Sequence, residues 1–462
     1  MSTDNLGSLT LALLLLVAGA TVLGQAAVRL RQPKVVGEIL AGILLGPSLL
    51  GWLAPDTASH IFGNGRSDPP TVVLGFLYHL GLLLLMFVSG SSVRNVLGKE
   101  NRKPTAWILG LGTPLSFFVT LLATLVLPLD RLVGDAGSRP AVALVLAIAA
   151  SVTSIPVITK IFYDLGILHT RFASLILGAA VLEDIVLWGV LALATALASA
   201  TVAAGGGALA GTVSAHVVAN VVYVLLAMTV LPRLLSRASR ARWNVLAAEA
   251  PVAWIVVVIF GYVSVAAALD VTLAFAAFLA GFGLVGGVRG TDHDLFRAPI
   301  DAINHVSGAV FIPIYFALVG YQLDFTKGFA PLMLLAFLVG SSAVVLLSIG
   351  LAAWLAGFRR LDIVNLAVTC NARGGPGIVL ASVAFDAEII SAPFFTTLVV
   401  TAVLTSQVCG TWLDVVLRRG WPLLASEGPV ETRKATLQPA RAPAQLAPTA
   451  GPDPVDDQVA RH

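Results

Sequence analysis

Apolar stretches of about 20 residues recur along almost the whole chain, and this recurrence limits the possible fold more than any other feature. A helix of that length spans the roughly 30 Å hydrocarbon core of a bilayer. Only 11% of the residues are charged, against roughly 25% in a soluble domain. Because backbone polar groups must be paired inside lipid, such uniformly apolar runs favour helices over the alternating strands of a barrel. The sequence therefore predicts an all-α polytopic membrane protein.

Breaks at Pro, Gly and charged residues divide the chain into about thirteen transmembrane helices. Their predicted starts lie near Leu9, Val35, Val72, Thr105, Pro140, Phe172, Leu209, Val252, Thr272, Ile300, Pro331, Ile363 and Ala392. We assign residues 1–424 to this membrane domain. Residues 425–462 are rich in Pro, Ala and Gln and have no apolar periodicity, so we expect a disordered cytoplasmic tail.

The charges of the predicted loops orient the chain in the membrane. If the amino terminus lies outside, 19 Lys and Arg residues fall in inside loops and 4 in outside loops. The positive-inside rule then predicts an external amino terminus and a cytoplasmic carboxyl terminus. The rule also accounts for the net charge of +3, so the basic balance does not indicate binding of nucleic acid.

Two adjacent carboxylates, Glu183 and Asp184, lie in the middle of the predicted sixth span, within the apolar run 179–187. Each costs roughly 2.5–3.5 kcal/mol at a helix centre, so an ion or proton pathway is the default interpretation. Adjacent helical residues point about 100° apart, so one of the two is enough to face a cavity. Asp184 is the stronger candidate, and for Glu183 a structural role stays open.

Two other predicted spans contain residues that interrupt a helix. The segment 151–156 of the fifth span places three hydroxyls before a proline, and the segment 371–377 of the twelfth contains Arg373 among three glycines and a proline. Helices broken at corresponding places in two halves of a transporter indicate a site at the membrane midplane. Thr153 and Ser154 are candidate cation ligands, although such hydroxyls also bond to carbonyls a turn earlier. Arg373 is a candidate countercharge for the carbonyl ends of the broken helices.

The positions of these breaks predict two inverted repeats of about six helices each, joined by a seventh span. The run from Gly42 to Gly46 predicts close helix packing, with the surface of a dimer as one location. His79, in the third span, could carry protons, but a lone His on an apolar face is more often a packed residue. Neither a cofactor nor a resident metal is expected, and the sequence offers no nucleophile, base and acid set typical of an enzyme.

Together, five segments resemble the monovalent cation:proton antiporter 2 family of bacterial sodium or potassium/proton exchangers. The resemblance runs in order over residues 25–417. It rests on Pro33–Pro47, Ser151–Pro156, Glu183-Asp184, Pro313–Gly320 and Asn371–Gly374.

The resemblance implies an antiporter in a bacterial plasma membrane that exchanges Na⁺ or K⁺ for H⁺ by alternating access. It implies a homodimer, with dimer helices at about 9–92 and 250–322 and moving core helices at about 104–199 and 330–419. Carried over by position, Asp184 matches the essential ion-binding carboxylate and Glu183 its neighbour. Thr153 matches the hydroxyl beside the helix crossing.

This chain departs from the family pattern in its charges. The acidic pair is Glu-Asp where two-acid sodium/proton members usually have Asp-Asp, and residues 331–357 lack the Lys that electrogenic members place in the eleventh span. If Glu183 has a static basic partner, Arg373 is the residue that the sequence offers. Stoichiometry and the choice between Na⁺ and K⁺ stay open, as do two other functions on the same scaffold, an ion channel or ion-gated sensor and an exporter of an organic ion.

Overall fold

The computed structural model describes residues 3–427 except 31, 64, 66–67, 93–106, 169, 205–217, 219–221, 240, 242–243, 270, 287–292 and 326–328. The described residues form helices joined by short loops, together with an isolated antiparallel bridge between Val133 and Ile390. The predicted tail lies outside the described residues from position 428 onward.

The first half of the chain forms α1 (Thr3–Arg29), α2 (Lys34–Leu45), α3 (Leu50–Leu53), α4 (Pro55–Phe62), α5 (Pro69–Ser92), η2 (Ile108–Gly112), α7 (Thr113–Ala123), η3 (Leu129–Arg131), α8 (Arg139–Ser151), α9 (Ile155–Asp164) and α10 (Arg171–Ala204). The second half forms η4 (Leu226–Val230), α12 (Leu231–Ser239), α13 (Val245–Glu249), α14 (Pro251–Ala268), α15 (Leu273–Gly286), α16 (His293–Val306), η5 (Ser307–Phe311), α17 (Ile312–Gln322), α18 (Pro331–Leu355), α19 (Arg360–Cys370), α20 (Gly374–Asp386) and α21 (Ala392–Arg418).

Seven helices in the described part are long and apolar enough to cross a membrane, and shorter apolar helices accompany them. The prediction of an all-α polytopic membrane protein is therefore confirmed. The eighth and ninth predicted spans are separate helices, because α14 ends at Ala268 and α15 begins at Leu273. The predicted starts near Thr105 and Leu209 lie outside the described residues.

Two helix pairs pack with their backbones almost in contact. In the pair α2 and α17, a Cβ added to Gly42 would lie 1.7 Å from the Ala317 carbonyl oxygen, and one added to Gly320 would lie 2.0 Å from that of Ile39. The pair α5 and α15 has the same reciprocal glycine contacts through Gly90 and Gly281. The close packing predicted from Gly42 is confirmed, but its partner is α17 of the same chain. Exchanging the two repeats maps the first helix pair onto the second, as inverted repeats require.

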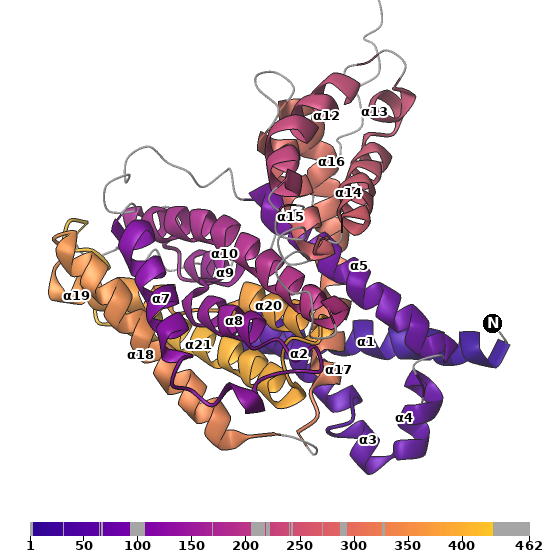
Figure 1. Ribbon diagram of the computed structural model, residues 1–462, viewed down its shortest axis with the longest axis horizontal. Helices are drawn as coiled ribbons and strands as arrows, with labels where there is room; N and C mark the ends of the chain where they lie inside the picture. Colours follow the sequence, from indigo (N-terminus) through magenta and orange to yellow (C-terminus); the bar gives the residue numbers. More distant parts are fainter. Residues whose placement is uncertain are drawn as a thin grey trace, which may run out of the picture. The chain divides into compact units, whose positions relative to one another are not determined.

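The remaining contacts divide the helices into two groups (Figure 1). In each group every helix contacts at least one other member. The first group contains α1, α2, α5, α14, α15 and α17, and the second contains α7, α8, α10, α18, α19, α20 and α21. In Figure 1 the purple helices α7 to α10 lie among the orange and yellow helices α18 to α21, so segments far apart in sequence form the second group. The predicted site residues all belong to this second group.

Loops that the charge pattern places on one face of the membrane contact each other. Residues 132–136 exchange backbone hydrogen bonds with residues 388–391, and both segments are predicted to be outside. On the predicted inside, the Ala425 amide donates to Asp362 and the Arg171 amide donates to Glu427. The structure therefore brings together, in these two places, loops that the charge pattern assigns to the same face.

Candidate functional site

The two adjacent carboxylates are buried inside the second helix group. Glu183 is 4% exposed and Asp184 2% exposed, both on α10. The Thr113 hydroxyl donates to Glu183 Oε2 over 3.1 Å. Within the part of the chain that the structure describes, Glu183 Oε1 and Asp184 Oδ1 have no hydrogen-bond partner. An unpaired buried charge costs several kcal/mol, so this environment favours the neutral form of each carboxylate over an unpaired ionised one.

Thr113 was missed by the sequence reasoning. It begins α7 directly after the π-helix η2 (Ile108–Gly112), and π-helical turns are frequent at functional sites. The available signal was a buried hydroxyl beside Gly112, but a Thr in an apolar helix ordinarily bonds to its own backbone. Only the tertiary arrangement brings this hydroxyl to Glu183, 70 residues further along the chain.

The two interrupted helices cross at their breaks. Helix α8 ends at Ser151 and α9 begins at Ile155, while α19 ends at Cys370 and α20 begins at Gly374. The Ser154 amide donates to the Ala372 carbonyl over 2.7 Å, and the Thr153 hydroxyl donates to the Cys370 carbonyl over 2.9 Å. Each break therefore supplies hydrogen-bond partners for the other, which satisfies backbone groups that a broken helix leaves unpaired.

Both predicted hydroxyl ligands lie at this crossing, and their partners differ. The Thr153 hydroxyl donates to the Cys370 carbonyl across the crossing. The Ser154 oxygen instead accepts from the Val157 amide over 3.4 Å and caps the start of α9. Ser154 is fully buried, like Thr153.

Arg373 is also buried, 2% exposed, and lies between the ends of the broken helices. Its Nη2 donates to the Ala150 carbonyl over 3.3 Å and to Asn371 Oδ1 over 3.2 Å, and its guanidinium lies 5.6 Å from the ring centroid of Phe337. Ala150 belongs to the last turn of α8, so the positive charge faces the negative end of that helix.

The predicted static contact of Arg373 with Glu183 is wrong, because no such ion pair occurs among the described residues. The guanidinium faces the end of α8, and the hydroxyl of Thr113 contacts Glu183 instead. Helix α18, which lacks the Lys expected of electrogenic members, contributes the hydroxyl of Ser342, which accepts from Asn371 Nδ2 over 3.1 Å.

Gly374 is required at the crossing for two reasons. Its φ is +40°, and an added Cβ would lie 2.5 Å from both Ser154 Oγ and Val157 Cγ2. Residues with a Cβ rarely adopt this backbone conformation. The glycine therefore lets α20 begin in contact with the α8–α9 break.

Comparisons with known proteins agree with this architecture. The family model for the transmembrane sodium/hydrogen exchanger matches residues 12–419. The chain is 23% identical to the Na⁺/H⁺-K⁺ antiporter GerN of Bacillus cereus, over 85% of this chain and 92% of that protein. It is 24% identical to a Na⁺/H⁺ antiporter of Enterococcus hirae, over 86% and 94%.

A solved structure shares the fold. The sodium proton antiporter MjNhaP1 of Methanocaldococcus jannaschii superposes with a TM-score of 0.56 at 15% identity, over 90% of this chain and 96% of that one. The family match spans the acidic pair, the crossing and the glycine-packed helices. The chain therefore belongs to the sodium/hydrogen exchanger family.

Proposed function

We propose that this chain is a secondary active antiporter that exchanges a monovalent cation, Na⁺ or K⁺, for H⁺ by alternating access. One observation carries the proposal: two adjacent buried carboxylates with unpaired oxygens lie beside the crossing of two broken helices. Membership of the exchanger family, and relatives named as Na⁺/H⁺ and Na⁺/H⁺-K⁺ antiporters, support the same function.

Asp184 is the proposed shared site for cation and proton. When its carboxylate is ionised, an alkali cation supplies the missing positive charge, and the Thr153 hydroxyl together with carbonyls of the crossing offers further hard oxygen ligands. When Asp184 binds a proton, the carboxyl is neutral and the cation is released. The carboxylate oxygens of Asp184 bind either the cation or the proton. Inward and outward movements therefore carry different ions, which is the coupling that antiport requires.

Glu183 is proposed to assist without exchanging its own proton. Its partner at 3.1 Å is a hydroxyl, Thr113, which is uncharged. A neutral partner has no charge that could replace the proton of Glu183 during the cycle. Glu183 therefore keeps its proton, and one proton moves per cation. This proposal makes the exchange electroneutral.

We further propose how the chain is placed and moves. Helices α7–α10 and α18–α21 form the moving core, and residues 9–92 and 250–322 contain the dimer helices of a homodimer surrounded by lipid. The amino terminus lies outside and the carboxyl terminus in the cytoplasm of a bacterium. The charge bias of the loops supports this orientation.

Proteoliposomes containing a pH dye and an imposed pH gradient test the function. Addition of Na⁺ or K⁺ should dissipate the gradient, with Li⁺ as a third probe of selectivity. Asp184→Asn keeps the side-chain shape but removes the titrating charge, so it should abolish the signal while insertion and dimerisation persist. Retention of half or more of the wild-type rate would contradict the role of Asp184.

A further inference from the structure

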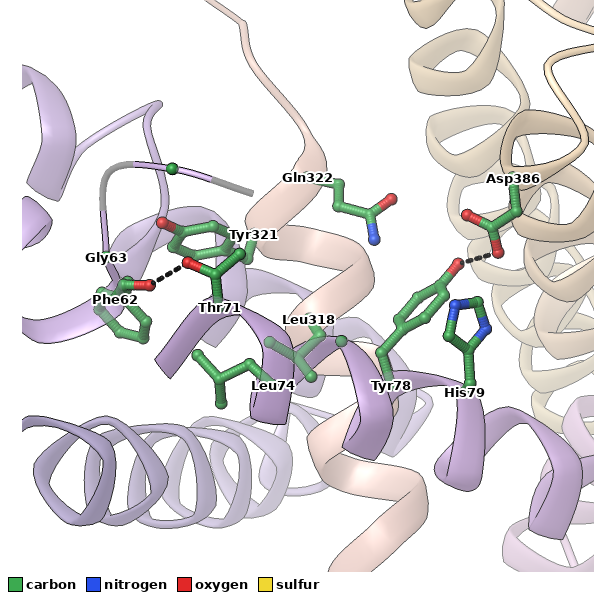
Figure 2. A pocket seen from close by; sticks show the side chains of 12 residues that line it. Phe62, Gly63, Thr71, Leu74, Tyr78, His79, Leu318, Tyr321, Gln322 and Asp386 are labelled. Atoms are coloured by element: carbon green, nitrogen blue, oxygen red, sulfur yellow. Dashed lines mark hydrogen bonds between the residues drawn. The ribbon is translucent and has the colours of Figure 1, made fainter. Parts of the chain in front are cut away.

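A cavity of about 410 Å³ lies between α5, α17 and the carboxyl-terminal end of α20. Figure 2 shows Tyr78 and His79 reaching into it from one face of α5, Tyr321 and Gln322 from α17, and Asp386 from α20. His79 lies ten residues into α5, which corresponds to a depth of about 15 Å from the helix start. By the proposed orientation, the cavity reaches from the external face to about half the thickness of the membrane.

Three side chains form a polar cluster in this cavity. The Tyr78 hydroxyl donates to Asp386 Oδ2 over 3.1 Å, and the rings of Tyr78 and His79 are 5.0 Å apart in an edge-on arrangement. Figure 2 shows the side chains of Tyr78 and His79 both beside the Asp386 carboxylate. Tyr78 is buried, whereas His79 and Asp386 are exposed. The sequence favoured a packed role for His79, and the structure instead places it at a cavity.

The cluster continues inward along α20. The Tyr78 ring lies 5.3 Å from that of Tyr315, whose hydroxyl donates to Ser382 Oγ over 3.0 Å. Ser382 lies one turn before Asp386 on the helix that begins at the crossing with Gly374. The polar contacts therefore connect the cavity to the half-helix that packs against the ion site, and they join α20 to α5 and α17 of the other helix group.

Ionisable groups on the elements around the cluster lie mostly outside the cavity. Glu388 follows Asp386 by two residues, and the helices packed on α20 carry Arg139 on α8, Arg171, Glu183 and Asp184 on α10, and Asp414 and Arg418 on α21, none of which lines the cavity. Among the described residues, the cavity lining adds only the Tyr321 phenol, and Tyr315 lies behind Tyr78. Helix α15 and η5, which also pack on α5, contain no ionisable side chain. The charged and titratable groups of α1 and α4 are outside the lining: Asp4, Arg29, Asp56 and His60.

We propose that His79 and Asp386 form a second proton-binding site, through which protons enter from the external solution. This inference rests on the proposed function and its orientation. A proton leaves hydronium and bonds to an imidazole nitrogen of His79, which leaves water. The Asp386 carboxylate stabilises the imidazolium, and the Tyr78 hydroxyl holds Asp386 in place. When the outside is open, the proton passes from His79 to cavity water, and a carboxylate oxygen of Asp184 then takes it.

Side-specific titration of the full chain tests this site. Vesicles with a uniform, verified orientation are used to measure Na⁺ or K⁺ exchange while the pH is varied on one side and fixed on the other. His79→Gln and Asp386→Asn should each shift the pH midpoint on the external side by half a unit or more, about threefold in proton affinity. The midpoint on the cytoplasmic side should not move. Tyr321→Phe, which removes a hydroxyl elsewhere in the same cavity, is the matched control and should leave both midpoints unchanged.

A second measurement does not depend on transport. The imidazole of His79 is titrated by NMR in nanodiscs with labelled histidine, in the wild type and in Asp386→Asn. Loss of the carboxylate should lower the pH at which His79 protonates by half a unit or more. The inference is overturned if this titration is unaffected, or if the transport variants change only the maximal rate or shift both sides equally. A wild type that exchanges no ion, with the His79 titration still dependent on Asp386, would contradict the proposed function and leave the proton site standing.

Discussion

The substitution Gly374→Ala should destabilise the helix crossing more than an added methyl group at any neighbouring position would. The new Cβ would lie 2.5 Å from Ser154 Oγ and from Val157 Cγ2, and 2.9 Å from Ser154 Cβ, so atoms of both residues must move. Overpacking of this kind typically costs about 1–3 kcal/mol. A left-handed backbone adds about 1–2 kcal/mol for a residue with a Cβ. The expected loss in the free energy of unfolding is therefore about 2–5 kcal/mol.

Gly375→Ala provides a matched control one residue further along α20. The nearest atom to a Cβ at Gly375 is Phe316 Cζ at 3.8 Å, an ordinary van der Waals contact. Its backbone is not in the left-handed region, and alanine favours a helix. Thermal unfolding of purified protein in detergent should show a clear loss for Gly374→Ala and little or none for Gly375→Ala. Equal melting temperatures for the two variants would refute the close contact of α20 with the α8–α9 break.

Three further predictions concern the charges and hydroxyls of the site. Arg373→Ala should clearly lower the melting temperature in detergent and change the apparent cation affinity less, since removing one partner of a buried charged contact typically costs about 3–5 kcal/mol. A normal melting temperature with a large shift in affinity would make Arg373 a transport residue. Thr113→Val should slow exchange in vesicles because Glu183 loses its hydrogen-bond donor. Thr113→Ser keeps the hydroxyl and should retain the wild-type rate. Equal rates for the two variants would contradict this role of Thr113. Glu183→Gln should leave the ratio of protons to cations exchanged unchanged, and exchange should be insensitive to a membrane potential set with valinomycin and K⁺. A reversal point of the exchange that moves with voltage would contradict electroneutral exchange.

The sequence predicts most of the fold because its strongest signals are local. Apolar length indicates spans, loop charges indicate sides, and Pro and Gly within spans indicate the two breaks, so each signal lies within one segment. The contact of Thr113 with Glu183 joins two helices, and nothing in either segment specifies their register. The direction of the Arg373 side chain depends in the same way on where α8 ends relative to α19. His79 was misjudged because the cavity that exposes it is made by three helices distant in sequence.

The absence from α18 of the Lys that electrogenic members place there bears on the charge that the proposed moving core carries across the membrane. If Glu183 keeps its proton, the core holds Arg373 and an Asp184 that binds either one cation or one proton, so its net charge is the same in both loaded states. The membrane potential then does no net work on the cycle. If Glu183 also gave up a proton on cation binding, the loaded states would differ by one charge, worth about 2.3 kcal/mol per 100 mV. The hydroxyl contact of Glu183 with Thr113 favours the first case, because a neutral donor adds no charge to either state.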